Sequence, residues 1–160
     1  MDIVVVKADY ASEKHRAEIP MLLDAYASDP MGGGVPLNEA VKRDLVRALS
    51  ERPYAFSLIA YVDDEPAGLA NCFEGFSTFA CKPLVNIHDI TVLGRYRGKG
   101  ISQKLLEKIE EIALSKGCCK LTLEVLGHNA VAQSAYTKFG FGAYELDPAT
   151  GCAQFWEKKL

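Results

Sequence analysis

A glycine-rich, basic segment near the middle of the chain joins an apolar run to an amphipathic run, and it constrains the fold more than any other feature. The segment reads GRYRGKGIS over residues 94–102. The run before it, VNIHDITVL over residues 85–93, is rich in branched side chains and predicts a strand. The run after it repeats apolar residues at helical spacing and predicts a helix over residues 100–116 that stops at Gly117. The junction therefore predicts a strand–loop–helix unit.

The rest of the chain extends this unit into a mixed α/β order. Further strands are expected over residues 3–6, 54–62, 67–73, 121–126, 141–146 and 153–158. Further helices are expected over residues 15–26, between Asn38 and Pro53, and over residues 129–139. Residues 63–66 make a hairpin turn, and the helix over 100–116 makes a right-handed parallel crossover. We expect one α/β domain over residues 1–160, with a mixed, mostly antiparallel sheet and helices on both faces.

Composition excludes several classes of protein. With 49% hydrophobic and 24% charged residues the chain is typical of a soluble globular domain, and its net charge of −3 argues against a nucleic-acid binder. No apolar run approaches the roughly 20 residues of a membrane span, and the acidic start MDIVVVKADY is too short for a signal peptide. The five cysteines lack metal-binding or disulfide spacing. We therefore expect a cytoplasmic protein without a metal site.

The glycine-rich segment has the chemistry of an anion site. The first N–H groups of a helix have no intrahelical partner, and the helix dipole places partial positive charge there. Gly98 and Gly100 remove side chains that would block an approaching phosphate, while Arg97 and Lys99 add positive charge. The spacings of the nucleoside-triphosphate loop and of the dinucleotide fingerprint are both absent. The alternative is a solvated basic turn.

Two motifs in this order resemble the GNAT superfamily of N-acetyltransferases, which bind acetyl-coenzyme A. RGKGIS over residues 97–102 is similar to the R/Q-x-x-G-x-G/A signature, with Ser102 in place of its last glycine or alanine. NAVAQSAYTKFGF over residues 129–141 is similar to the second motif, N-x-x-A/S-x-x-x-Y-x-K/R-x-G-F. The resemblance covers essentially the whole chain. It implies a GNAT-like fold, acetyl-CoA as co-substrate, transfer of an acetyl group to an amine, and a homodimer.

The resemblance also implies which residues hold acetyl-CoA. The backbone amides of residues 98–102 are expected to hold the pyrophosphate, and Ile90 and Val92 to pair with the pantetheine arm as a neighbouring strand would. Asn129 is expected to contact the cofactor. The full set of expected cofactor-binding residues is Ile90, Thr91, Val92, Arg97, Gly98, Lys99, Gly100, Ile101, Ser102, Asn129 and Tyr136.

Three residues are candidates for acid–base catalysis. Tyr136 matches the family's tyrosine that protonates the departing thiolate, although a packed aromatic on a helix is the alternative. His88 is the first candidate base, with a hydrogen-bonded strand histidine as the alternative, and Glu124 on the neighbouring strand is the second. Strand alternation predicts that His88 shares a face with Ile90 and that Asp89 points to the opposite face.

The nature of the acceptor is less constrained. The segment around residues 88–92 resembles the diamine and polyamine branch of the family, where an acidic pair stands, but His88 replaces the first acid and weakens the case for a polycation. The expected acceptor is a primary amine of an amino acid, a diamine or an amino metabolite. Residues 75–83 are interpreted as a loop over the acceptor, and residues 30–35 as a lid or a flexible connection. A non-catalytic coenzyme A-binding module and a protein or peptide N-acetyltransferase are the alternatives.

Overall fold

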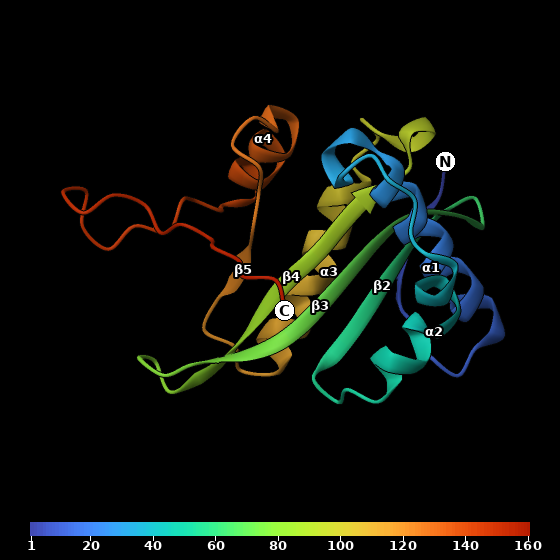
Figure 1. Ribbon diagram of the computed structural model, residues 1–160, viewed down its shortest axis with the longest axis horizontal. Helices are drawn as coiled ribbons and strands as arrows, with labels where there is room; N and C mark the ends of the chain where they lie inside the picture. Colours follow the sequence, from blue (N-terminus) through green and yellow to red (C-terminus); the bar gives the residue numbers. More distant parts are fainter. The chain divides into compact units, whose positions relative to one another are not determined.

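Five strands form one sheet in the order β1-β2-β3-β4-β5 in the computed structural model, which describes residues 1–160 (Figure 1). The strands are β1 (Ile3–Lys7), β2 (Ala55–Val62), β3 (Glu65–Ser77), β4 (Lys82–Val92) and β5 (Leu121–Leu123). The first four are antiparallel neighbours, whereas β5 runs parallel to β4. The mixed, mostly antiparallel α/β sheet expected from the sequence is confirmed.

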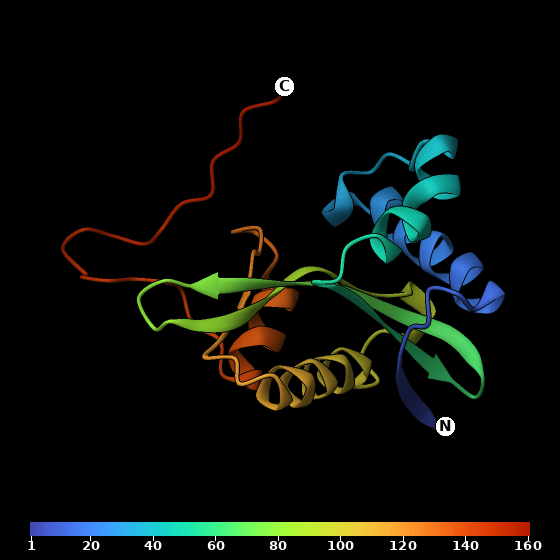
Figure 2. The same cartoon turned by 90° about the horizontal axis from the view of Figure 1, so that it is seen from below.

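Helices cover both faces of this sheet. The helices are α1 (Glu13–Ser28), α2 (Glu39–Ser50), α3 (Ile101–Ser115) and α4 (Ala130–Phe139), with short 3-10 turns η1 (Pro30–Gly32) and η2 (Gly94–Tyr96). Figure 2 shows α1 and α2 on one face and α3 on the other. None of these helices combines the length and the apolar composition that a membrane crossing needs. The chain divides into two compact units, residues 1–123 with the whole sheet and residues 124–160 with α4.

Each face of the sheet has its own apolar layer. Under α1 and α2 the buried cluster consists of Ile19, Leu22, Val46, Leu49, Ile59, Tyr61 and Leu69. Under α3 the buried helix residues are Ile101, Leu105, Leu106, Ile109 and Ala113. A Cβ atom on Gly68 of β3 would stand 3.3 Å from side-chain carbons of both Ile101 and Leu105, so glycine there allows α3 to lie close to the sheet. The sheet is therefore buried between two layers of helix.

Residues 75–83 form a hairpin instead of the expected loop over the acceptor. β3 runs on to Ser77 and β4 begins at Lys82, so only residues 78–81 connect them. The cross-strand partners of Gly75 and Phe76 are Leu84 and Pro83. The glycine, serine and proline of this segment suggested a loop, but a long antiparallel ladder can carry them because it satisfies the backbone of both strands.

The second unit lacks the two strands expected near the end of the chain. In residues 141–160 a single bridge joins Glu145 to Cys152, and no strand forms. Tyr144, Phe155 and Trp156 give this segment a strand-like composition, yet 57%, 73% and 82% of their surfaces are exposed. A strand needs the backbone of a neighbour, which composition does not supply. The single domain over residues 1–160 stays a prediction.

Candidate active site

β4 contains an extra residue at His88 relative to its partner β3. Asn71 of β3 pairs with Asp89, but the next residue, Cys72, pairs with Ile87. His88 therefore has no partner of its own, which is the geometry of a β-bulge. A bulge shifts the alternation of every residue that follows it in the strand.

The backbone hydrogen bonds at the two ends of β4 show the same shift. Val85 donates its N–H to Lys120 beside β5, at 3.2 Å, whereas Leu93 donates its N–H to Ala67 beside β3, at 2.8 Å. In a regular strand, residues eight apart direct their N–H groups to the same edge, because the backbone alternates with period two. The opposite directions here require an inserted residue between them.

The bulge places His88 and Asp89 on the same face of the sheet. Both side chains line one cavity on the face covered by α1 and α2. Val92 is paired with Gly68, which faces α3, so Val92 and Ile90 lie on the other face. The expectation that His88 shares a face with Ile90 is therefore wrong, because regular alternation was assumed across the bulge. Asp89 does lie opposite Ile90, as expected, but on the same face as His88.

The second half of β4 has an edge that no strand covers. β5 pairs only with Val85, Asn86 and Ile87. Past the bulge, the direction of Leu93 towards β3 means that Ile90 and Val92 point their N–H and C=O groups to the opposite edge. The carbonyl of Val92 accepts a hydrogen bond from Arg97 Nε at 3.1 Å. The uncovered edge thus begins at the bulge, beside the cavity.

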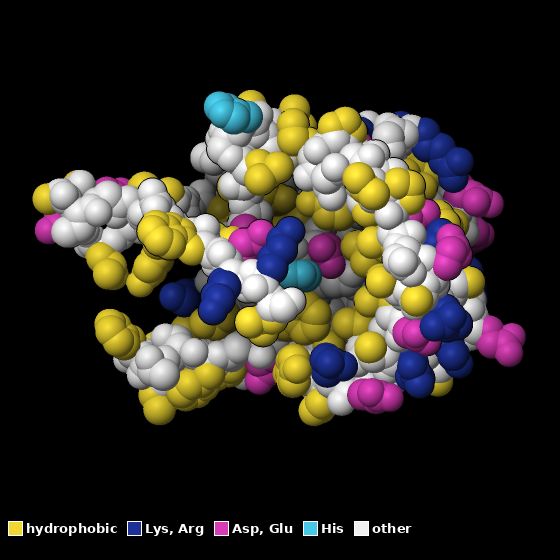
Figure 3. Space-filling view, viewed as in Figure 1, with side chains coloured by type: hydrophobic (Ala, Val, Ile, Leu, Met, Phe, Trp, Pro, Cys, Tyr) yellow, Lys and Arg dark blue, Asp and Glu magenta, His cyan; other side chains and the backbone are white.

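The cavity has a volume of about 340 Å³, and its leucines come from other elements than its charged and amide side chains. Its leucines belong to α1, α2 and the connection between them; they are Leu23, Leu37, Leu45 and Leu49. Its polar groups from the strands are Asn71 of β3 with His88 and Asp89 of β4. Phe73, Tyr26, Ala27 and Gly32 complete the lining. Figure 3 shows a histidine beside acidic side chains, with hydrophobic side chains close by.

A chain of hydrogen bonds crosses three strands and ends on Asp89. The Ser57 hydroxyl donates to Asn71 Oδ1 at 2.6 Å, and Asn71 Nδ2 donates to Asp89 Oδ2 at 3.0 Å. Because the single hydroxyl hydrogen of Ser57 is used on Asn71, the Tyr10 hydroxyl, 2.9 Å from Ser57 Oγ, donates to Ser57. Burial raises the pKa of Tyr10 and keeps it a donor.

This chain fixes the carboxylate at the floor of the cavity. Ser57 is 0% and Asn71 3% exposed, so both depend on each other for their hydrogen bonds. Each donor in this chain of hydrogen bonds is directed towards Asp89, an arrangement that suits a negatively charged carboxylate as the last acceptor. The sequence predictions include neither Tyr10 nor Ser57. The one feature of the sequence that could have indicated this group of residues is Ser57, a serine inside the apolar strand AFSLIAYV.

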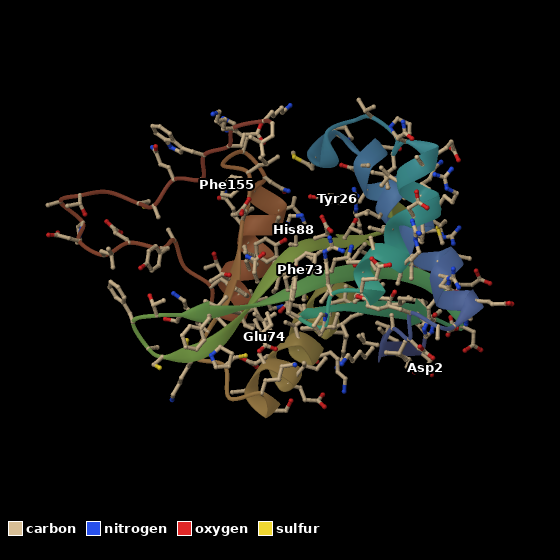
Figure 4. All side chains as sticks on the ribbon, turned by 60° about the horizontal axis from the view of Figure 1, so that its bottom comes forward. Asp2, Tyr26, Phe73, Glu74, His88 and Phe155 are labelled. Carbon is tan, nitrogen blue, oxygen red and sulfur yellow. The ribbon has the colours of Figure 1, made fainter.

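Two aromatic residues flank His88 and Asp89. The rings of Phe73 and His88 meet edge to face with their centroids 5.5 Å apart. Tyr26 of α1 lines the same cavity, and its pKa is raised by burial and then by the charges of Asp89 and Asp29. Figure 4 shows Tyr26, Phe73 and His88 close together. Tyr26 is therefore a neutral phenol beside the carboxylate, a position that no sequence pattern indicated.

The glycine-rich junction forms an open turn at the start of α3. Gly98 and Gly100 have φ angles of 76° and 81°, in the left-handed region that favours glycine, and a Cβ atom at either would meet nothing within 4 Å. No side chain caps α3 at Gly100, whereas Ser12, Asn38 and Asn129 cap α1, α2 and α4. An uncapped helix start with open space before it suits a phosphate group.

Arg97 differs from the mobile cation that the sequence suggested. Its Nη2 atom lies 2.8 Å from Asp29 Oδ2, and its Nε atom is bonded to Val92. The hydrogen bond from Arg97 lowers the pKa of Asp29, as does the bond from the Met31 N–H. Asp29 begins the turn η1, which includes the cavity residue Gly32. The pair therefore ties the glycine-rich junction to the connection after α1.

The remaining expected site residues lie in residues 124–160. Glu124 is not on a strand as expected, because β5 ends at Leu123, and its side chain is exposed. Asn129 caps α4 by accepting a hydrogen bond from the Ala132 N–H at 3.1 Å. Tyr136 lies on α4 with its ring 6.0 Å from that of Phe141. Their expected roles stay predictions.

Comparison with known sequences gives a family. Residues 19–141 match the model of the family described as acetyltransferase (GNAT). The chain is similar to thialysine N-epsilon-acetyltransferase of Mus musculus, with 33% identity over 125 residues that cover 73% of this chain and 70% of the relative. The corresponding enzyme of Caenorhabditis elegans is 28% identical over 84% of this chain and 79% of its own.

Comparison with solved structures gives the same fold. A probable acetyltransferase aligns with a TM-score of 0.79 and 19% identity, covering 98% of this chain and 99% of its own. AAC(6')-Iy, solved in complex with the bisubstrate analog CoA-S-monomethyl-acetylneamine, aligns with a TM-score of 0.76 and 18% identity over 100% of both chains. At these identities the likeness shows the fold alone.

Proposed function

The chain belongs to the acetyltransferase (GNAT) family and is an N-acetyltransferase, and we propose that it transfers the acetyl group of acetyl-CoA directly to the primary amine of a small molecule. One observation carries this proposal. The bulge at His88 brings a cavity with a fixed carboxylate next to a strand edge with unused backbone groups. An amine and an extended thioester arm need two such neighbouring places, and holding them together supplies much of the rate.

The residues of the glycine-rich junction fit the cofactor. The uncapped start of α3 and the open turn at Gly98 and Gly100 would hold the pyrophosphate through the backbone amides of residues 98–102. Ile90 and Val92 would pair with the amide groups of the pantetheine arm along the uncovered edge of β4. Bound there, acetyl-CoA supplies an activated thioester carbonyl. The backbone N–H groups of β4 would polarise that carbonyl.

The reaction then needs one base and one acid. His88 would take the proton from the ammonium group, directly or through water, so that the neutral nitrogen forms the new C–N bond. As the C–S bond breaks, Tyr136 would give its proton to the thiolate, which is basic enough to accept it. The second proton, which the nitrogen loses on becoming an amide, would restore the phenol of Tyr136, directly or through water. Asp89 would hold the ammonium group before the proton leaves. Glu124 is the alternative base.

The assembly and location of the enzyme are also part of the proposal. We expect a homodimer, because residues 141–160 carry exposed aromatic side chains such as Phe155 and Trp156 and have almost no strand pairing of their own. All five cysteines are free, which suits the reducing cytoplasm. The net charge of −3 gives no reason to expect a nucleic-acid partner.

A thiol-release assay tests the reaction. Wild type with acetyl-CoA and a panel of amines should release coenzyme A in an amine-dependent manner, and Tyr136→Phe should lower kcat by roughly 10²–10⁴-fold. The matched control is Tyr144→Phe, an exposed tyrosine in the same unit, which should keep full activity. Tight binding of acetyl-CoA without thiol release on any amine or peptide would favour the non-catalytic binding module instead.

A further inference from the structure

We propose that the acceptor is a monocation: a primary amine carried on an uncharged, apolar body, and neither a diamine nor an amino acid. This inference rests on the proposed function, because it assigns the cavity of about 340 Å³ to the acceptor. A volume of this size lies at the small end of ligand sites, so it suits a compact amine.

The charges of the lining support this choice. Asp89 is the only carboxylate among the lining residues, and no lysine or arginine is among them. A second ammonium group would have no counter-charge and would lose its hydration against leucine side chains. An acceptor carboxylate would find no cation, and would be repelled by Asp89.

The placement of the lining residues supports the apolar body. On the sheet side of the cavity, Asn71, His88 and Asp89 lie with the ring of Phe73. The helix side carries all the lining leucines, and its one polar side chain is the phenol of Tyr26. An amine held at Asp89 therefore extends its body from the sheet towards α1 and α2. There an alkyl or aryl group gains from burial, while a charged group would lose.

Three acceptors of equal length test the inference. Hexylamine, 1,6-diaminohexane and 6-aminohexanoate share a primary amine on a six-carbon chain and differ only in the far group. We expect kcat/KM for hexylamine to exceed that for the other two by about 100-fold, the range that one unmatched group in a pocket produces. An equal or higher kcat/KM for the diamine or the amino acid would overturn the inference.

A charge placed on the helix side should shift this preference. Leu45→Glu adds a carboxylate to the cavity lining, and it should raise kcat/KM for 1,6-diaminohexane relative to hexylamine by at least about tenfold. The matched control is Val41→Glu, one turn earlier on α2, which is 44% exposed and does not line the cavity. It should leave the ratio unchanged. If thermal unfolding shows that Leu45→Glu does not fold, Leu37→Glu serves in its place.

A binding measurement separates this inference from the proposed function. Calorimetric titration of the same three amines into the chain saturated with coenzyme A reports their order of affinity without turnover. If no amine is acetylated but hexylamine still binds most tightly, the proposed function fails, while the preference of the cavity for a monocation with an apolar body holds. If the diamine or the amino acid binds more tightly than hexylamine, the inference fails whatever the turnover.

Discussion

The two halves of β4 differ in how completely the sheet uses them. From Val85 to Ile87 the strand has β3 on one edge and β5 on the other, and Val85 and Ile87 are buried beneath α3. From His88 on, only β3 pairs with it, and its side chains include His88, Asp89 and Thr91. The first half holds the sheet together. The second half has one edge of its backbone without a strand partner and directs His88 and Asp89 into the cavity.

The bulge is what separates these two halves. One extra residue reverses the edge to which the backbone points and the face on which side chains lie. It thereby brings both His88 and Asp89 into the cavity and aims the backbone of Ile90 and Val92 away from β3. We call the half of β4 from His88 on the open half and the half up to Ile87 the closed half. Changes in the open half should therefore lower activity, and changes in the closed half should lower the stability of the fold.

The largest expected effect is the loss of the carboxylate in the open half. Asp89→Ala should lower kcat/KM for the amine by about 1,000-fold, because it removes the group that holds the buried ammonium. Steady-state kinetics measures it, with circular dichroism to verify folding. The control is Asn86→Ala in the closed half, whose side chain bonds Thr122 at 3.0 Å. Near-normal activity of the Asp89→Ala variant would show that Asp89 is not part of the site.

The same substitution in the two halves should have opposite consequences. Ile90→Pro removes an N–H that β3 does not use, so it should raise KM for acetyl-CoA by about 10-fold or more with little change in stability. Val85→Pro removes the bond to Lys120 and should lower the free energy of unfolding by about 1–3 kcal/mol. Equal losses of stability in both variants, measured by urea unfolding, would contradict the distinction.

A smaller effect is expected from breaking the hydrogen-bond chain behind the open half. Ser57→Ala leaves Asn71 Oδ1 without its donor and Tyr10 without its acceptor, so the free energy of unfolding should fall by about 1–3 kcal/mol. The amine KM should rise as well, since Asp89 loses its alignment. Ser134→Ala, exposed on α4, is the control. A stable variant with unchanged kinetics would show that the chain does not position Asp89.

The smallest effect concerns the ion pair that joins the open half to η1. Because Arg97 lowers the pKa of Asp29, the pair stabilises the fold above the unfolded-state pKa of about 3.9, and this contribution is lost as the pH falls through the lowered pKa. The stability advantage of wild type over Asp29→Asn should therefore be constant near neutral pH and shrink below about pH 4. An advantage that grows on acidification would contradict this sign.

Local sequence rules predicted the parts of the molecule that local physics decides. The open glycine turn at positions 98 and 100, the helix that starts after Asn38, and the helical spacing after Gly100 all match the structure. The expected strand at residues 85–93 matches β4 within three residues at its start and one at its end. Each of these depends on residues that are close in the chain.

The remainder depends on partners that are distant in the chain. The bulge at His88 is defined by the register against Asn71 and Cys72, which no alternation pattern in β4 contains. The extended β3–β4 hairpin and the missing strands of residues 141–160 depend in the same way on whether a neighbour supplies hydrogen bonds. The sequence therefore predicted candidate residues in this strand but placed His88 and Asp89 on opposite faces, whereas they share one.

Residue-resolved amide hydrogen exchange of β4, with and without saturating acetyl-CoA, tests the division of this strand most directly. We expect the amides of Ile90 and Val92 to exchange more slowly when acetyl-CoA is bound, because the pantetheine arm then occupies the uncovered edge. The amide of Val85, already bonded to Lys120, should not change. Unchanged exchange at Ile90 and Val92 in the saturated protein would contradict the account, because the open half would then not receive the cofactor.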